Sequence, residues 1–564
     1  MHVLSLHRAR VIWLLACSGP TPRPGAEAGD NAGEILVDGD LILGEQITCE
    51  DPSLRETEGP LYAPDLGDTW NDQPYDSGER RDSPGLVVAD ITGDGRYEIF
   101  LTNKSASWVF RLKDDGSMSD LSDEILPDRN EHNLWGGSAA DYDGDGDIDV
   151  FAQAVGLKNR LYRNDGGWFT DATRTSVFEE LVYASKGSAW GDMDLDGDLD
   201  LVVSNETSTA DEEFYDPPDD GPPNQVYENL GDGSFELRED ILSREASVSY
   251  TFLTAWLDLD ADLDPDLYSV NAFGHIMYGN RLLENRIEDG ELLFEDISGE
   301  SSAFLDMDGM GLGIGDLNGD EYIDMLVTDW GRLWLLESAG PMSWYDTTAV
   351  RGLTLPKEDD RIVAWGAELV DLDNDTDLDL VVMFGESIRG ARREHPENPE
   401  EQPDGLWLQN DDGVFELVAD DWAFSDQLGA GRGFAPVDLN DDGYLDIVKR
   451  MAYEPATLHL SRCGTDNWLR VRLAHPAPNT HAIGAKVRVV VDGESQIRWI
   501  VAGGTSLGYG GPNEAHFGLG EHETVDRLDV IWPDGTVTRH ADVDANQKVW
   551  VARDGVRTVV GMPD

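Results

Sequence analysis

The sequence predicts an all-β fold: a seven-bladed β-propeller with calcium-binding loops, followed by a small β-rich C-terminal domain. The first observation behind this prediction is a short acidic loop that recurs seven times, at intervals of 51 to 67 residues. The second is the aliphatic, β-branched segment that follows each loop. Repetition at such a period is typical of repeat architectures, in which each copy forms one supersecondary unit.

The clearest loop runs from Asp141 to Asp149. It has a carboxylate at positions 1, 3, 5, 7 and 9 and a glycine, which allows a sharp turn, at position 6. Ca²⁺ takes about six to eight oxygen ligands, so alternate carboxylates of a tight loop suit this ion. Without a cation the carboxylates would repel one another. The pattern predicts a calcium site, and an acidic, solvated turn copied by duplication is the alternative.

The candidate metal ligands are the oxygen-bearing side chains at alternate positions of the seven loops, which predict up to seven Ca²⁺ ions. They are Asp90, Thr92, Asp94 and Glu98; Asp141, Asp143, Asp145, Asp147 and Asp149; Asp192, Asp194, Asp196, Asp198 and Asp200; Asp258, Asp260, Asp262, Asp264 and Asp266; Asp316, Asn318, Asp320 and Asp324; Asp371, Asp373, Asp375, Asp377 and Asp379; and Asp438, Asn440, Asp442 and Asp446. The glycine of position 6 is replaced by Leu263, Glu321 and Thr376 in the fourth, fifth and sixth loops.

An EF-hand does not fit these loops. That loop requires a bidentate Glu at position 12 and a helix on each side. Position 12 is never acidic here, and the flanking segments, such as Leu199–Val203 and Leu378–Val382, have the composition of strands.

Each repeat predicts four short strands. A small or aromatic segment such as Leu134–Ala140 precedes the loop, and an aliphatic segment such as Leu199–Val203 follows it. A third segment ends in Asn, as in Asn159–Asn164, and a fourth carries Phe, as in Trp168–Asp171. Four short strands with tight turns, repeated radially, describe a propeller blade. We therefore place seven blades in residues 41–465 and assign the Trp and Phe residues to packing between strands.

These loops resemble the FG-GAP or VCBS repeats of integrin-α-like propellers, with their Asp-x-Asp-x-Asp-Gly-x-x-Asp pattern. The resemblance implies that calcium lies in the turn between the first and second strands of each blade. It applies to positions 1, 3, 5 and 9 of each loop.

The composition restricts the possible partners. The chain has 41 Lys and Arg against 113 Asp and Glu, a formal net charge of −72. Nucleic acids and anionic membrane surfaces require a basic surface, so neither is expected as a partner. A basic partner or a salty habitat remains open.

The N-terminus predicts export. Residues 1–17 combine a basic start with the short apolar run Val11–Ala16, and Leu14–Cys17 resembles a lipobox with Cys17 as the lipidated residue. Residues 18–40 are expected to form a linker. The predicted location is a bacterial outer-membrane lipoprotein or a secreted or cell-surface protein, with membrane contact only through the anchor on Cys17. A frayed apolar N-terminus behind a misplaced start codon is the alternative.

The two ends of the propeller are predicted to close the ring together. The last repeat lacks a fourth strand before the composition changes, and the strand-like residues 41–66 have no other place. This arrangement would bring Cys49 and Cys463 together, so we predict a disulfide, which an oxidising compartment permits. Two unrelated free thiols are the alternative.

Residues 466–555 predict a separate β-rich unit with a tail at 556–564. Its segments Asn467–Leu473, Ala482–Val491, His516–Gly520 and Leu528–Gly535 look like the ASPIC/UnbV domain that follows such propellers in the cartilage-acidic-protein-like family. The stretch Gly503–Gly511 departs from that family's pattern. It lacks a Gly-Lys-Ser/Thr ending, so it does not predict a phosphate loop.

Two insertions follow the second strand of their repeats and are candidates for a binding surface. They span residues 205–223 and 385–405, and the second contains Arg389, Arg392, Arg393 and His395. Loops on a rigid scaffold often bind ligands, but a tolerated surface insertion is an equal alternative. His132 and His275 are weaker candidates near the same face or the channel, because a lone histidine is more often structural.

The leading functional hypothesis is a non-enzymatic, calcium-stabilised binding or adhesion module for a protein or glycan at the cell surface. No Ser-His-Asp spacing, zinc signature or dinucleotide fingerprint is found, so no catalytic or cofactor-binding residue is predicted. An enzyme with an axial or interdomain site is one alternative. A passive scaffold within an envelope complex is the other.

Overall fold

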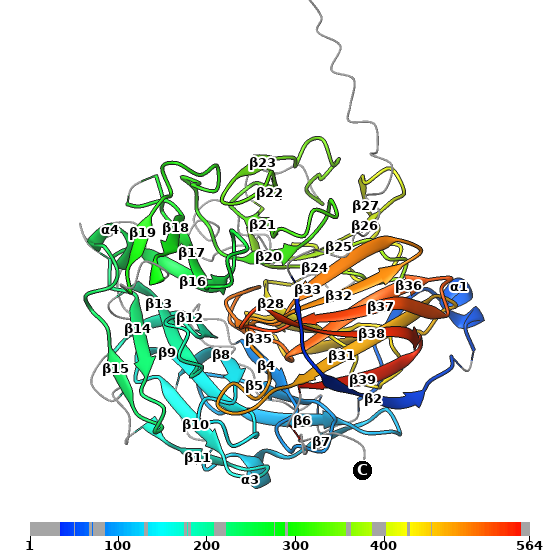
Figure 1. Cartoon of the computed structure of the whole chain (residues 1–564). Coiled ribbons are helices and arrows are strands. Elements are labelled where there is room, and N and C mark those ends of the chain that lie inside the picture. Colours follow the sequence, from blue (N-terminus) through cyan, green and yellow to red (C-terminus); the bar gives the residue numbers. More distant parts are fainter. Residues whose placement is uncertain are drawn as a thin grey trace, which may run out of the picture.

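The computed structural model of the chain is built almost entirely from strands (Figure 1). It describes residues 34–556 except residues 50, 67–69, 71–84, 129–132, 174–177, 179–181, 208–220, 276, 288–291, 357–361, 386–401, 426–428, 453 and 554–555. Its short helices are α1 (Ser53–Glu58), α3 (Ser122–Ile125) and α4 (Arg244–Ser247).

Within the described residues, seven antiparallel units of four strands follow one another along the chain. Unit 1 contains β4 (Leu86–Ala89), β5 (Glu98–Leu101), β6 (Trp108–Leu112) and β7 (Met118–Asp120); unit 2 β8 (Leu134–Ala140), β9 (Asp149–Leu157), β10 (Arg160–Asn164) and β11 (Phe169–Asp171); unit 3 β12 (Tyr183–Gly191), β13 (Asp200–Thr207), β14 (Gln225–Asn229) and β15 (Phe235–Leu237); unit 4 β16 (Tyr250–Leu257), β17 (Asp266–Ala272), β18 (Arg281–Asn285) and β19 (Phe294–Asp296). Unit 5 contains β20 (Leu312–Gly315), β21 (Asp324–Thr328), β22 (Leu333–Ser338) and β23 (Trp344–Asp346); unit 6 β24 (Ala364–Val370), β25 (Asp379–Phe384), β26 (Gly405–Gln409) and β27 (Phe415–Leu417); unit 7 β28 (Gly431–Val437), β29 (Asp446–Met451), β30 (Thr457–Ser461) and β3 (Leu61–Tyr62).

The units are arranged in a ring with their first strands at the centre (Figure 1). β28 of unit 7 contacts β4 of unit 1, so the ring is closed. Large aromatic side chains, among them Trp190, Trp344 and Trp407, are fully buried in it, as the sequence predicts. An all-β fold of the propeller type is thus confirmed.

The N-terminal segment closes the ring only in part. β3 pairs with β30 as the outer strand of unit 7, which confirms that residues before unit 1 complete the last unit. The prediction that the propeller begins at residue 41 was wrong for β2 (Gly39–Gln46), which pairs with β39 (Gln547–Arg553) of the C-terminal domain. β1 (Ile35–Leu36), expected in the linker, pairs with β38 (Thr536–Asp544) of that domain. The sequence of β1 and β2 indicates that both are strands. It does not indicate which sheet they join, because that depends on which sheet has an unpaired edge strand close to them in the fold.

Cys49 and Cys463 form the predicted disulfide, with a Cα–Cα distance of 5.6 Å. The bond joins the segment between β2 and β3 to the connection between unit 7 and the C-terminal domain. It therefore links both ends of the ring covalently.

The C-terminal domain is a sandwich of two sheets. One has the order β1–β38–β37–β32–β33, with β37 at Thr524–Ile531, β32 at Lys486–Val491 and β33 at Glu494–Trp499. The other has the order β2–β39–β31–β36, with β31 at Asn467–Ala474 and β36 at Glu514–Gly520. The core of this domain is continuous with that of units 2 and 3, because Leu469, Phe517 and Trp532 belong to the same buried cluster as Phe151 and Trp190.

A glycine-rich segment of the C-terminal domain enters the centre of the ring; we call residues 502–510 the axial segment. β34 (Ala502–Gly503) pairs with β12 of unit 3, and β35 (Tyr509–Gly510) pairs with β4 of unit 1. Ser506 forms a bridge with Leu312 of unit 5. At the tip, Leu507 packs in a buried cluster with Trp135, Phe252 and Trp365 of units 2, 4 and 6. The stretch Gly503–Gly511, to which the sequence assigned no function, thus fills the centre of the ring.

The close fit of the axial segment gives a testable prediction. A Cβ at Gly503 would lie 2.4 Å from the carbonyl oxygen of Ser188, whereas a Cβ at Gly493 would meet nothing within 4 Å. Both residues have positive φ, +80° and +88°, so alanine costs about 1 kcal/mol of backbone strain at either. Gly503→Ala is expected to lose at least ~2 kcal/mol more than Gly493→Ala, because a backbone atom cannot move aside easily. Denaturant unfolding of both variants measures this, and equal losses would contradict it.

Removing the disulfide gives a second prediction. The cysteines are 414 residues apart, so their bond strongly restricts the unfolded chain. The double variant Cys49→Ser/Cys463→Ser is expected to lose about 2–4 kcal/mol of unfolding free energy. Reduction of the wild-type chain should lower its stability equally and leave the double variant unchanged. If the reductant also destabilised the double variant, the loss of stability could not be assigned to the disulfide.

Candidate metal sites beneath the C-terminal domain

Each acidic loop is the turn between the first and second strands of its unit, and its position-9 carboxylate is a structural anchor. Asp149 accepts hydrogen bonds from the N–H of Tyr142 in its own loop (3.0 Å) and of Asn164 at the end of the third strand (2.7 Å). The side chain of Asn164 then donates to the carbonyl of Ile91 in the loop of unit 1. Asn229 and Asn285 link units 3 and 4 to the loops before them in the same way. The Asn that ends the third strand thus connects neighbouring units.

Four of the seven loops bring three carboxylates within 4.8 Å of one another in the described part of the chain. These groups are Asp141, Asp143 and Asp149; Asp192, Asp194 and Asp200; Asp258, Asp260 and Asp262; and Asp371, Asp373 and Asp379. In three of them the members occupy positions 1, 3 and 9, as the ligand pattern predicts. The position-7 residues Asp147, Asp198, Asp264 and Asp377 are outside these groups.

Three of these four groups, those at 192, 258 and 371, contain carboxylate oxygens that the described residues leave without a hydrogen bond. Within the described residues, Asp192 Oδ1, Asp258 Oδ1, Asp371 Oδ1 and Asp373 Oδ1 are buried and accept no hydrogen bond. Burying a carboxylate oxygen without a hydrogen bond or a cation reduces the free energy of unfolding. Hard oxygen donors at this density fit Ca²⁺, whose coordination would satisfy them.

The first loop has a different arrangement, because Arg111 of β6 reaches into it. The guanidinium lies 2.9 Å from Asp94, donates to Glu98 at 2.5 Å and contacts Thr92. Three of the four predicted ligands of this loop are therefore held by a side-chain cation. The sequence contains Arg111 but shows no signal that it turns toward the loop.

The C-terminal domain covers the face of the ring that carries the loops. Its cations bond the loops of four units: Arg472 meets Asp90 (3.3 Å), Lys486 meets Asp258 (2.7 Å), Arg488 meets Glu321 (2.6 Å) and Arg470 meets Asp438 (2.6 Å). Uncharged groups of the C-terminal domain contact the loops of the other three units. The hydroxyl of Thr480 contacts Asp141, Pro478 is adjacent to Gly197, and the N–H of Gly520 donates to Asn374.

Sequence reasoning did not find this interface. The signal that could have indicated it is the spacing of Arg470 and Arg472 on β31 and of Lys486 and Arg488 on β32. Residues two apart on a strand share a face, so each pair places two cations on one side of the domain. Such a basic face is unusual in so acidic a chain.

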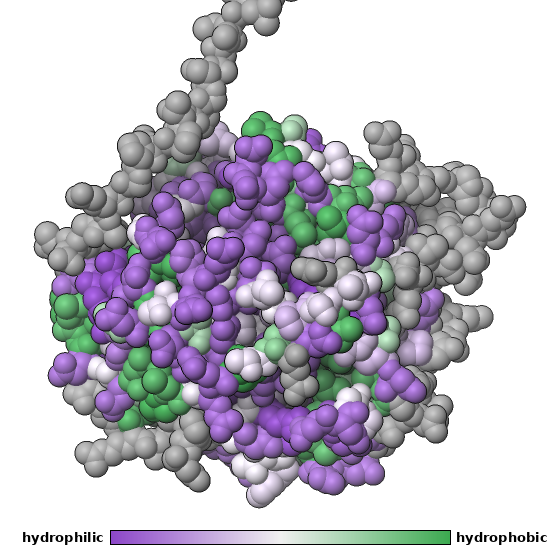
Figure 2. All heavy atoms as spheres, turned by 90° about the vertical axis from the view of Figure 1, so that its right-hand side faces the viewer, coloured by the Kyte–Doolittle hydropathy of each residue, from purple (hydrophilic) through white to green (hydrophobic). Residues whose placement is uncertain are grey.

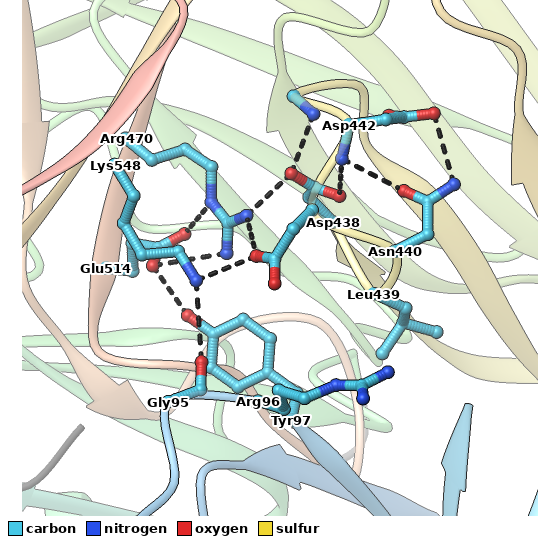
Figure 3. A network of polar contacts seen from close by, with 12 residues as sticks. Gly95, Arg96, Tyr97, Asp438, Leu439, Asn440, Asp442, Arg470, Glu514 and Lys548 are labelled. Atoms are coloured by element: carbon cyan, nitrogen blue, oxygen red, sulfur yellow. Dashed lines mark hydrogen bonds and ion pairs between the residues drawn. The ribbon is translucent and has the colours of Figure 1, made fainter. Parts of the chain in front are cut away.

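Glu514 is the centre of the polar network where units 1 and 7 meet the C-terminal domain (Figure 3). It accepts hydrogen bonds from Arg470 (2.5 Å), Arg472 (2.8 Å) and the hydroxyl of Tyr97 (2.7 Å). Although burial opposes ionisation, the two guanidinium groups hold the pKa of Glu514 well below its usual range. Lys548 adds a hydrogen bond to Asp441 in the seventh loop. The network joins both ends of the ring to the domain by charge.

Burial changes the titration of the loop carboxylates in the metal-free protein. Burial, together with the charge of neighbouring aspartates, raises the pKa of Asp141 and Asp192 to about 7 and that of Asp264 to about 8. These loops therefore hold protons near neutral pH unless another cation replaces them.

Of the remaining predicted residues, the structure describes His275 but not His132 or Cys17. The side chain of His275 is 56% exposed, with Nδ1 3.7 Å from Asp308. His132, Cys17, residues 208–220 of the first insertion and the segment 386–401, with its three arginines and His395, lie outside the described residues. Among the described residues, no helix is long and apolar enough to cross a membrane.

The comparisons with known families agree with this architecture. Residues 75–152 and 316–382 match the FG-GAP-like repeat, and residues 475–558 match the family described as ASPIC and UnbV. The chain therefore contains FG-GAP-like repeats and a C-terminal domain that matches ASPIC and UnbV. The structure adds to this description that the ASPIC and UnbV domain covers the acidic loops of the FG-GAP ring.

The chain also matches curated relatives. It is 25% identical over 516 residues to cartilage acidic protein 1 of Xenopus tropicalis, covering 83% of this chain and 73% of the relative. Cartilage acidic protein 1 of Homo sapiens is 24% identical over 512 residues, covering 82% and 70%. The chain is homologous to these proteins over most of its length. Rhamnogalacturonan lyase YesW is a solved structure with 13% identity and a TM-score of 0.36, covering 71% of this chain and 74% of that one, and supports no functional conclusion.

The raised pKa values predict how stability depends on pH when calcium is removed. In the folded state Asp141 and Asp264 keep protons up to pH about 7 and 8, whereas in the unfolded chain they lose them near pH 4. Raising the pH through this window therefore favours unfolding, because the unfolded state binds fewer protons. In chelator, the melting temperature is expected to fall between pH 5 and pH 8, and Asp141→Asn should reduce the slope. A melting temperature that rises over this range would contradict the prediction.

Proposed function

We propose that this protein is an exported, calcium-binding β-propeller that acts as a non-enzymatic binding module for a protein or glycan at the cell surface. The observation that carries the calcium part is the set of buried aspartate oxygens without partners in the loops at 192, 258 and 371. Calcium would satisfy these oxygens and remove the repulsion between neighbouring carboxylates.

The proposed calcium sites are the four loops that bring three carboxylates together. In the fourth loop Lys486 bonds Asp258, so calcium there competes with an ammonium group. The fifth and seventh loops have Asn at position 3, which supplies an oxygen with less charge. In the first loop Arg111 already provides the positive charge, so calcium is least favoured there.

Export is supported by the disulfide, which persists in oxidising compartments. Extracellular calcium modules bind with Kd of about 10⁻⁴–10⁻³ M, and calcium of that order is present outside cells. The lipid anchor on Cys17 remains part of this proposal.

The proposed binding surface is the face of the ring opposite the C-terminal domain. The loop face is covered by that domain, and the axial segment fills the centre, which weakens the alternative of an enzyme with an axial site. The turns between the second and third strands lie on the opposite face, and the two insertions belong in sequence to turns of this kind. The side of the molecule seen in Figure 2 is mainly hydrophilic, with hydrophobic residues only in small groups, which favours polar recognition on that side as well.

Calcium binding gives a direct prediction. At a free concentration ten times its Kd, each ion would add about 1.4 kcal/mol of stability, so chelation should lower the melting temperature. Asp194→Asn removes a position-3 ligand of the third loop and should reduce the number of bound ions by one. Asp94→Asn, in the loop held by Arg111, should leave the number unchanged. Metal analysis of the purified chain measures this, and an equal loss in both variants would refute the assignment.

The partner proposal is tested by capture with the full calcium-loaded chain on glycan arrays and membrane extracts. The matched variant replaces residues 386–401 with a short Gly-Ser linker. Binding is expected to be lost in this variant while its calcium content and melting temperature remain unchanged. Binding that survives the replacement would place the partner elsewhere, and absence of any calcium-dependent partner would favour a passive scaffold.

A further inference from the structure

A lysine and an aspartate of neighbouring units lie fully buried against each other. Lys449 belongs to β29 of unit 7, and Asp404 directly precedes β26 of unit 6. The Nζ atom of Lys449 is 2.7 Å from Oδ2 of Asp404, and both side chains are 0% exposed. Burying two opposite charges lowers the stability of the fold unless their attraction and further hydrogen bonds compensate for it.

Within the described residues, the hydrogen bonds around this pair are fewer than an ammonium and a carboxylate require. Nζ donates to the carbonyl oxygen of Phe424 at 2.9 Å and lies 3.9 Å from the centre of its ring. Oδ1 of Asp404 accepts from the backbone N–H of Phe384 at 2.9 Å. Oδ2 accepts no aligned hydrogen bond, although Nζ is close to it. An ammonium group has more donors, and a carboxylate more acceptor sites, than these bonds use.

The same contacts are those that an amide between the two side chains would need. The nitrogen of such an amide carries one N–H, and the carbonyl oxygen of Phe424 is its acceptor. The oxygen of the amide would be Oδ1, which already accepts from the N–H of Phe384. Oδ2, the atom that condensation would remove, is the one without a hydrogen bond. The surroundings therefore fit the neutral amide better than the charged pair.

We propose that Lys449 and Asp404 condense to an intramolecular isopeptide bond that links units 6 and 7. Nζ passes one proton to Oδ2, which gives a neutral amine and a carboxylic acid. The lone pair of Nζ attacks Cγ of Asp404, a second proton moves from Nζ to Oδ2, and the Cγ–Oδ2 bond breaks. One amide and one water molecule are formed, so atoms, electrons and charge balance without a co-reactant.

The site favours this reaction in three ways. Burial raises the pKa of Asp404, against the opposing charge of Lys449, and so favours the carboxylic acid that the reaction consumes. The N–H of Phe384 points at Oδ1, where negative charge develops during the attack. The fold holds the amine against the carboxyl group, which makes the step effectively unimolecular. Exclusion of water from the buried site then protects the amide from hydrolysis.

The isopeptide bond would restrain a part of the ring that the disulfide does not. Cys49 and Cys463 join the segments on either side of the ring, whereas Asp404 lies at the end of the second insertion. An amide to Lys449 would fix this end of the insertion to unit 7, and a reductant would not break it. The proposed function is not required, because neither residue belongs to an acidic loop or to the segment 386–401.

Peptide mapping of the full wild-type chain tests the bond directly. After reduction, alkylation and trypsin digestion, we expect a branched peptide that contains Lys449 and Asp404 and is lighter than its two linear parts by one water molecule. Trypsin should not cleave after Lys449, because its amine is acylated. Lys449→Arg cannot form the bond and should give linear peptides only. Lys186→Arg changes the buried Lys186–Glu206 pair, which is 3.3 Å apart, and is the matched control that should keep the branched peptide.

Substitutions of Asp404 test the leaving group. Asp404→Asn should form the same amide with loss of ammonia in place of water, so its branched peptide should have the same mass as that of the wild type. Asp404→Ala should give no branched peptide. The proposal is overturned if the wild-type digest contains Asp404 and Lys449 only in linear peptides, a result that does not depend on the folding of any variant. It is also overturned if Lys449→Arg retains the branched peptide.

Discussion

Neutralisation of the acidic loops is the physical constraint on which the rest of the structure depends. Seven turns place carboxylates at one end of the ring, and burial makes their charge expensive unless a cation is near. Arg111 supplies this cation inside unit 1, and the C-terminal domain supplies it to Asp90, Asp258, Glu321 and Asp438. In the part of the chain that the structure describes, no Lys or Arg forms an ion pair with the clusters at 141, 192 and 371, which makes them the strongest calcium candidates.

The same constraint explains why the ring and the C-terminal domain form one structure. The domain brings basic residues to an acidic face, shares a core with units 2 and 3, and inserts the axial segment between the inner strands. Strands β1 and β2, which precede the ring in the sequence, complete the two sheets of the C-terminal domain. The Cys49–Cys463 disulfide joins the segments on either side of the ring. Because the domain covers the loop face and the axial segment fills the centre, the opposite face of the ring is the proposed binding surface.

Much of the fold could be predicted because its signals are local. The acidic loop, the aliphatic strand after it and the Asn that ends several of the third strands all lie within one repeat of 51 to 67 residues. The ring closure and the pair Cys49–Cys463 followed from counting strands in the last repeat. The pairing of β2 with β39 could not be predicted, because a short alternating strand fits any open edge of similar polarity. The ion pairs between the C-terminal domain and the acidic loops were equally hidden, since their partners are far apart in the sequence.

The sequence by itself determined that the chain forms repeated four-stranded units with dense oxygen ligands in their turns, because strand period and ligand spacing are properties of adjacent residues. Only the tertiary structure decided which turns are held by a side-chain cation and which bring together three carboxylates that could hold a metal ion. Arg472 reaches Asp90 across 382 residues of sequence. Electrostatic pairing acts through space, so no spacing along the chain encodes it.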